Sequence, residues 1–278
     1  MLARNSDNPQ HKKTEKLMSN LLATKALMTT LETGAWRATK LHSAESEKVA
    51  TANNVQRDVT RVTVKLSAHP ALVGLNKLHA AARSEHYRLT LPAATDGFRL
   101  LPCGRELEHS KIMQKFSTDH ESFVNEFLLA YDAERAAAPV RLGGLYDSRH
   151  WPASVGGRFK FLTRYMPCPD IGTWNDWLKE SADEAQAELQ SRLSDALRSF
   201  RDKLKDPKAI FRDTLVSNLH DICELSGDLN LMDDPVIKLV VSQAKTLTVI
   251  PADTLRNDQS KRSEIAAKAA EICASIKF

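Results

Sequence analysis

The 278-residue chain is poor in the residues that interrupt or cross-link a fold. It has 10 Gly, 11 Pro and 4 Cys, and aromatic residues make up 6% of it. So few Gly and Pro favour helices over the many tight turns of a β-sandwich. The cysteines, at positions 103, 168, 223 and 273, form no CxxC pair and no zinc-finger spacing. We therefore expect reduced thiols and no structural zinc site.

Signatures of catalysis are also missing. The sequence has no GxxxxGK[ST], GxGxxG, HExxH or GxSxG motif, so the usual sequence marks of phosphate loops, dinucleotide folds, zincins and hydrolases are absent. Glu106 and His109 have the ExxH spacing of di-metal bundles, but the second ExxH that such a site needs is absent. We expect no cofactor, no metal and a non-enzymatic protein, with an enzyme of scattered catalytic residues as the open alternative.

Long apolar runs are lacking as well. The longest fall far short of the roughly 20 residues that a membrane helix needs. The N-terminus carries basic residues but no apolar stretch of the signal-peptide kind. We expect a cytoplasmic protein that does not enter a membrane.

Charge is unevenly distributed along the chain. The formal net charge is +4, yet residues 1–90 hold 14 Lys and Arg against 7 Asp and Glu, while the remaining 188 residues hold 25 against 28. A basic N-terminal third suggests a polyanionic partner such as nucleic acid. A solvated charged surface is the alternative explanation.

Helical periodicity covers most of the chain. Apolar spacing predicts helices over residues 11–33, 70–85 and 106–138, and helices throughout the C-terminal 100 residues. We predict an α+β fold, mostly α, with long helices packed on a small antiparallel sheet and a C-terminal helical bundle. The expected organisation is a basic helical arm (1–57), an α+β core with a hairpin and a long helix (58–170) and a helical region (171–278).

Four short segments alternate between apolar and polar residues, as β-strands do. They cover residues 59–66, 87–92, 98–102 and 158–166. If they share one sheet, one face is apolar and the other carries seven cations, a basic surface with aromatics of the kind that binds single-stranded nucleic acid. Neutralisation by carboxylates of neighbouring helices is the alternative. The candidate binding residues are Arg61, Lys65, Arg88, Arg99, Arg158, Lys160 and Arg164, with Tyr87 or Trp36 as a base-stacking platform.

Two histidines, His79 and His86, lie seven residues apart. They have the chemistry to contact phosphate, but we interpret them as part of a solvated helix face.

Several segments along the chain form a pattern that extends over most of its length. They are residues 36–66 with Arg61 and Lys65, Ser84–Pro92, Gly97–Pro102, the helix from Glu106, Phe211–Leu219, Leu229–Pro235, Leu255–Arg256 and the Ala-rich final helix. In these segments the sequence resembles a family of uncharacterised, mostly helical phage and prophage proteins. The resemblance implies a phage-encoded protein acting in the bacterial cytoplasm, and it brings no catalytic residues with it.

Two functions follow as hypotheses. The first is a non-enzymatic protein that binds nucleic acid, in the form of an oligomeric single-stranded DNA binding or annealing factor. The second is a helical scaffold that assembles with itself or with another phage or host protein through its C-terminal helices. The apolar stripe over residues 185–204 supports the second hypothesis, although packing in a core explains the same stripe.

Overall fold

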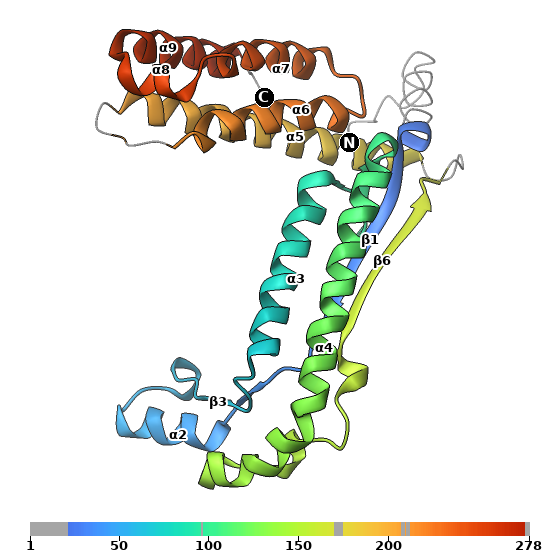
Figure 1. Ribbon diagram of the computed structural model, residues 1–278, viewed down its shortest axis with the longest axis vertical. Helices are drawn as coiled ribbons and strands as arrows, with labels where there is room; N and C mark the ends of the chain where they lie inside the picture. The colour runs from blue at the N-terminus through green and yellow to red at the C-terminus, as the bar shows by residue number, and fades with distance from the viewer. Residues whose placement is uncertain (1–21, 96, 170–174, 207–208, 210–211, 276–278) are drawn as a thin grey trace, which may run out of the picture. The chain divides into compact units, whose positions relative to one another are not determined.

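The computed structural model describes residues 22–278 except 96, 170–174, 207–208, 210–211 and 276–278 (Figure 1). It confirms an α+β fold that is mostly helical, with one four-stranded sheet and a second sheet of two strands. The strands are β1 (Ala26–Gly34), β2 (Thr39–Leu41), β3 (Thr63–Lys65), β4 (Leu91–Pro92), β5 (Arg99–Pro102) and β6 (Lys160–Pro167). The helices are α2 (Ser43–Ala52), α3 (Pro70–Leu89), α4 (Glu106–Leu142), α5 (Asn175–Lys205), α6 (Thr214–Leu229), α7 (Pro235–Thr248), α8 (Ala252–Asn257) and α9 (Gln259–Ser275).

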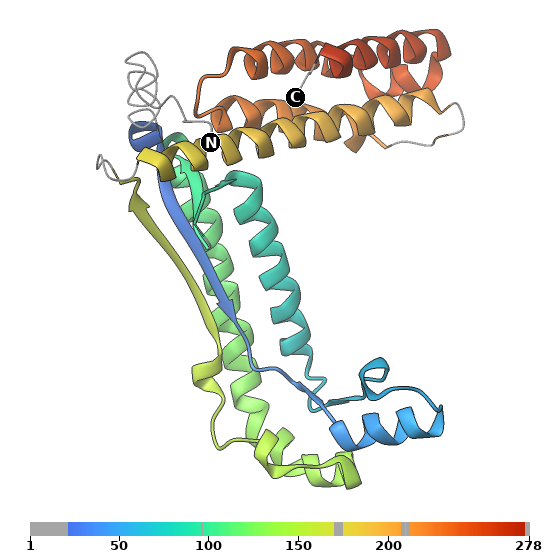
Figure 2. The same ribbon diagram turned by 180° about the vertical axis from the view of Figure 1, so that it is seen from behind.

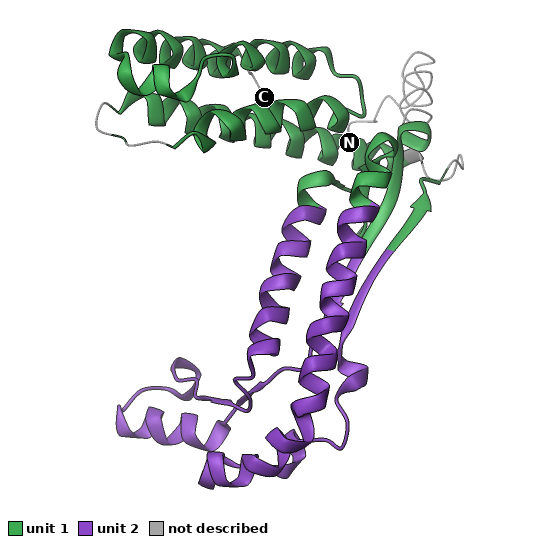
Figure 3. Cartoon of the chain, in the orientation of Figure 1, with its two compact units in different colours: residues 1–30, 87–109, 164–278 green, residues 31–86, 110–163 purple. Residues whose placement is uncertain are grey.

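The chain divides into two compact units whose segments interleave along the sequence (Figure 3). Unit 1 comprises residues 1–30, 87–109 and 164–278, and unit 2 comprises residues 31–86 and 110–163. The units therefore do not follow the three consecutive regions expected from the sequence, and the boundary runs through β1, α3, α4 and β6.

Unit 2 is built around a cluster of buried aromatic rings. Trp36 stacks on Phe127 with ring centroids 5.7 Å apart, and it packs against Tyr131 at 5.6 Å and Trp151 at 5.5 Å. Val64 of β3 is buried in the same core. Because aromatic rings bury large areas and prefer such stacked and edge contacts, this cluster fixes the segment between β1 and β2.

The two long helices of unit 2 lie side by side (Figures 1 and 2). The His69 side chain caps the start of α3 by accepting a hydrogen bond from the Ala71 backbone N–H, and Pro70 occupies the first turn. Gly74 allows close approach, because a Cβ atom there would lie 2.5 Å from the Phe123 ring of α4. A glycine inside a helix costs stability, and here it permits this contact.

Unit 1 contains the C-terminal helices α5 to α9. The apolar stripe predicted over residues 185–204 lies on α5 and packs in the core. Its residues Leu189, Leu193 and Phe200 are almost completely buried. Asp234 caps α7 by accepting from the backbone N–H groups of Val236 at 2.7 Å and Ile237 at 3.4 Å.

One predicted helix is partly wrong. Residues 26–34, the end of the predicted 11–33 helix, form strand β1, whereas residues 1–21 lie outside the described part of the chain. β1 pairs antiparallel with β5, from Ala26 opposite Pro102 to Thr29 opposite Arg99. The backbone hydrogen bonds of this tertiary pairing outweigh the weak local preference for a helix.

The condition that all four basic strands share one sheet is not met. The four-stranded sheet has the order β4–β5–β1–β6, while β3 pairs with β2 in the separate two-stranded sheet. The expected hairpin is shorter than predicted, because Tyr87, Arg88 and Leu89 form the last turn of α3 and only β4 and β5 remain as its strands. In contrast, β6 alternates as predicted, with Lys160 and Arg164 exposed.

No helix among the described residues combines the length and the apolar character needed to cross a lipid bilayer.

Candidate nucleic-acid interface

Three adjoining hollows follow the segment of residues 33–44 in unit 2. The first hollow, of about 940 Å³, lies between this segment and α3. The second, of about 540 Å³, shares residues 34–37 with the first and extends to residues 149–160. The third, of about 630 Å³, lies between residues 41–44 and 145–150 and shares Arg149 and His150 with the second. We call the first and second hollows the basic hollows, because Lys and Arg side chains line both of them.

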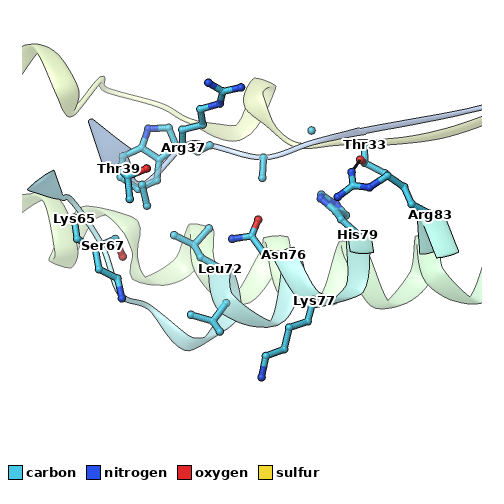
Figure 4. A pocket seen from close by; sticks show the side chains of 15 residues that line it. Thr33, Arg37, Thr39, Lys65, Ser67, Leu72, Asn76, Lys77, His79 and Arg83 are labelled. Atoms are coloured by element: carbon cyan, nitrogen blue, oxygen red, sulfur yellow. Dashed lines mark hydrogen bonds between the residues drawn. The ribbon is translucent and has the colours of Figure 1, made fainter. Parts of the chain in front are cut away.

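The first hollow is lined by one face of α3 and by the end of β1 (Figure 4). Asn76, His79 and Arg83, at helical spacings of three and four, lie on that face. The Arg83 guanidinium donates to the Thr33 hydroxyl at 2.7 Å, which holds it at the wall of the hollow. The cations that line this hollow are Arg37, Lys65, Lys77 and Arg83.

The second hollow is lined by cations from three separate parts of the sequence. Arg37 belongs to both hollows, and Figure 4 shows its side chain pointing away from Lys77. Its other cations are Lys40, Arg149, Arg158 and Lys160. The fold thus brings together cations that are more than 100 positions apart in the chain.

The electrostatics of the basic hollows are one-sided. Eight different Lys and Arg residues line them, and none of the described lining residues is Asp or Glu. Arg149 pairs with Asp147 at 2.7 Å, but the other seven make no ion pair with any residue that the structure describes. Like charges held this close repel one another unless an anion neutralises them. The arrangement is therefore suited to binding a polyanion.

His79, which lines the first hollow, forms a neutral pair with His120. His79 Nε2 lies 3.0 Å from His120 Nδ1, and the two rings stack with centroids 5.1 Å apart. Burial lowers the pKa of His79 to about 4 and also lowers the pKa of His120. At neutral pH the pair is uncharged, so the positive charge of the hollow comes from Lys and Arg. The solvated helix face predicted for His79 and His86 is wrong, because both are buried on the inner side of α3.

The basic hollows collect some of the predicted binding residues. Lys65, Arg158 and Lys160 line them and are exposed, although they come from two different sheets and a turn. Arg61 is exposed in unit 2, in the loop before β3, but it does not line either hollow. The predicted clustering of these cations holds only in part.

The remaining predicted cations belong to unit 1 and line neither of the basic hollows. Arg99 lies 4.5 Å from the ring centroid of Tyr87 and donates to the Thr90 hydroxyl at 2.7 Å. Arg88 lies 3.7 Å from the Glu108 carboxylate. Arg164 is exposed on β6. The Arg88 contact matches the alternative given in the sequence analysis, in which a carboxylate of a neighbouring helix neutralises the cation. Here that carboxylate is Glu108 of α4.

The two proposed stacking platforms differ in accessibility. Tyr87 is 51% exposed, but Arg99 covers one face of its ring. Trp36 is 8% exposed, and its ring packs in the aromatic core of unit 2. Trp36 as a base-stacking platform is therefore wrong, because Phe127, Tyr131 and Trp151 occupy its surroundings.

Sequence reasoning missed five of the eight cations: Arg37, Lys40, Lys77, Arg83 and Arg149. A signal existed for one of them, since Asn76, His79 and Arg83 have the spacing of a single polar helix face. Arg37 and Lys40 lie beside Trp36 in a segment without clear periodicity, so their convergence is visible only in the fold.

No family model, no curated protein and no solved structure matches the chain.

Proposed function

We propose that this protein binds nucleic acid through the basic hollows of unit 2. The observation that carries the proposal is the convergence of eight Lys and Arg side chains around two hollows with no lining carboxylate among the described residues. Phosphate groups would replace the counterions that such a surface otherwise attracts, and the release of those ions favours binding. Binding of this kind needs no covalent step and no cofactor.

Single-stranded DNA is the ligand we propose. The two basic hollows lie on either side of residues 34–37, so successive phosphates must bend around this segment to enter both. A single strand bends freely over a few nucleotides, whereas a duplex is stiff over about 150 base pairs. The resemblance to phage proteins adds the proposed setting, a phage-encoded binding or annealing factor in the host cytoplasm.

The test is a salt titration with a fluorescently labelled oligonucleotide, read by anisotropy. If most of the eight cations contact phosphate, the slope of log affinity against log salt should approach roughly −5, because each contact on a single strand contributes about −0.7. Lys65→Gln should make the slope less steep by about 0.7. Lys115→Gln, an exposed lysine of α4 outside the hollows, is the matched control and should leave it unchanged. Affinity that does not depend on salt would contradict the proposal.

A second candidate function, self-assembly or partner binding, is favoured by an observation in unit 1. Helix α7 exposes Val236 and Leu239, which are 45% and 57% exposed and three residues apart. An apolar pair at helical spacing suits a contact with another helix. Light scattering after size exclusion tests this candidate: Leu239→Lys should lower the measured mass if α7 forms an oligomer contact.

A further inference from the structure

The third hollow differs chemically from the two basic hollows. Two exposed leucines line it, Leu41 at 50% and Leu145 at 38% exposure, together with the half-buried ring of Tyr146. It is also lined by a carboxylate, that of Asp147. Arg149 also lines this hollow, but its guanidinium is paired with Asp147 at 2.7 Å. A phosphate gains little from apolar side chains and from a cation that is already neutralised, so this hollow is poorly suited to the charged backbone of a polynucleotide.

The hydrogen-bonding groups of the third hollow are fixed by local contacts. Asp147 accepts from the Arg149 backbone N–H at 2.9 Å and from its guanidinium Nη2 at 2.7 Å. These bonds lower the pKa of Asp147 to about 2, so the carboxylate stays ionised. Two further bonds from the Arg149 Nε, each 3.0 Å long, leave both carboxylate oxygens occupied by Arg149. His42 Nδ1 accepts from the Glu45 N–H at 3.2 Å, which leaves the proton of the neutral ring on Nε2 as a donor.

The third hollow directly continues the basic hollows. Arg149 and His150 line both the second and the third hollow, and Lys40 of the second is followed by Leu41 of the third. A strand whose phosphates occupy the second hollow therefore has its next group at the entrance of the third. Apolar faces combined with a few placed donors and acceptors are typical of sites for flat, uncharged, polar rings.

We propose that the third hollow is a nucleobase subsite. The inference rests on the proposed function, and it assigns phosphates to the basic hollows and one unstacked base to the hollow of Leu41, Leu145 and Asp147. Single-strand binding proteins commonly hold a base between apolar or aromatic side chains while cations hold the backbone. The His42 Nε2–H is a donor from which the ring nitrogens and carbonyl oxygens of a base can accept a hydrogen bond.

The experiment compares a cytosine oligonucleotide with an abasic one of the same length and charge. We expect the intact strand to bind about tenfold more tightly, because the abasic strand has no base to fill the third hollow. A variant with Ala44→Leu and Ser148→Leu fills the third hollow from two exposed positions. It should bring the ratio of the two affinities close to one and leave the salt slope unchanged. Ser122→Leu, an exposed serine of α4 outside the hollows, is the matched control.

A second variant probes the same site without filling it. Leu41→Ser and Leu145→Ser combined remove the two exposed leucines of the third hollow, so the advantage of the intact strand over the abasic strand should fall. Circular dichroism of each variant confirms that it is folded.

The outcomes distinguish a failure of the nucleobase subsite from a failure of the proposed binding of nucleic acid by the basic hollows. Equal binding of intact and abasic strands with a steep salt slope overturns the base subsite and leaves the phosphate hollows standing. A ratio that persists in the filled variant also overturns it, because the base is then bound elsewhere. If neither strand binds at any salt concentration, the proposed function itself fails and the subsite fails with it.

Discussion

The two units differ in how they use their positive charge. Unit 1 contains 24 Lys and Arg and 24 Asp and Glu, whereas unit 2 contains 15 and 11, so the whole net charge of +4 belongs to unit 2. In unit 1 a buried arginine stabilises the fold. Arg262 is 5% exposed and donates to the backbone oxygens of Leu204 at 2.9 Å and Lys203 at 3.0 Å. In unit 2 seven cations surround open hollows without ion pairs among the described residues. The presence of partners, more than the number of cations, distinguishes structural arginines from those available to a ligand.

The largest effect on stability should come from the aromatic core of unit 2. Trp36→Ala removes a ring that contacts Phe127, Tyr131 and Trp151, and the free energy of unfolding should fall by about 3–5 kcal/mol. Tyr87→Ala in unit 1 removes a half-exposed ring and should cost about 1 kcal/mol or less. Urea denaturation followed by circular dichroism measures both. Equal decreases would show that Trp36 is not a core residue.

The next largest effect should be on the affinity for single-stranded DNA. A pair of triple variants, one in each unit, compares unit 2 with unit 1. Arg37→Gln, Lys65→Gln and Arg158→Gln combined remove three charges from the basic hollows, and we expect affinity for a single-stranded oligonucleotide to fall about a hundredfold. The salt slope should become less steep by about 2, because each of the three cations contributes about 0.7 to it through its phosphate.

The matched control removes three charges from unit 1. The combined variant Arg88→Gln, Arg99→Gln and Arg164→Gln has the same net charge as the first, and it should change affinity by less than threefold, roughly, because it acts only through long-range attraction. Anisotropy titrations at the same ionic strength decide the matter. If the second variant loses as much affinity as the first, net charge rather than the basic hollows governs binding.

Acidic pH should lower the free energy of unfolding by an amount comparable to the binding free energy lost in the triple variant of unit 2. Burial lowers the pKa of His79 in unit 2 and of His109 in unit 1, each to about 4, from an ordinary value of 6.5. Between these values the unfolded chain binds protons that the folded chain does not, so stability is complete above pH 6.5 and is lost as the pH falls to about 4. We expect a loss of about 3.5 kcal/mol for each histidine once it is fully protonated, from a pKa difference of about 2.5 at about 1.4 kcal/mol per pKa unit.

Substitution separates the two histidines. His79→Gln should reduce the loss between pH 7 and pH 4.5. The remainder belongs to His109, whose ring lies 2.8 Å from the Tyr165 hydroxyl, and to His120, whose pKa is also lowered by burial. Urea titrations at the two pH values measure the difference. A stability that is the same at both values in the parent protein would contradict the burial of both rings in their neutral form.

The smallest of these effects concerns the start of α7 in unit 1. Asp234→Ala removes the acceptor for the Val236 and Ile237 N–H groups and should cost about 1 kcal/mol. Asp234→Asn keeps an acceptor and should cost less. Thermal unfolding of the two variants gives the comparison, and equal shifts of Tm would show that the cap contributes nothing.

Local periodicity was enough to predict the elements that carry one strong pattern. The α3 and α4 helices and strand β6 were predictable because Leu72, Leu75 and Leu78 repeat at helical spacing and Phe159, Phe161 and Tyr165 at strand spacing. Strand β1 was not, because Leu27, Met28 and Leu31 fit a helix locally and only pairing with β5 decides its conformation.

The candidate site was less predictable than the fold. Alternation correctly placed Lys65, Arg158 and Lys160 on exposed faces, but it could not show that β3 and β6 belong to different sheets. Trp36 illustrates a further limit, since one aromatic residue among cations suits a stacking platform and a core equally well. Only tertiary packing distinguishes the two.

The most direct test of the central claim is peptide mapping of ultraviolet cross-links between the protein and a single-stranded oligonucleotide. The account predicts cross-links in residues 33–44, in residues 65–83 of α3 and its approach, and in residues 145–160, all within unit 2. Cross-links confined to unit 1, or none at low salt, would contradict it.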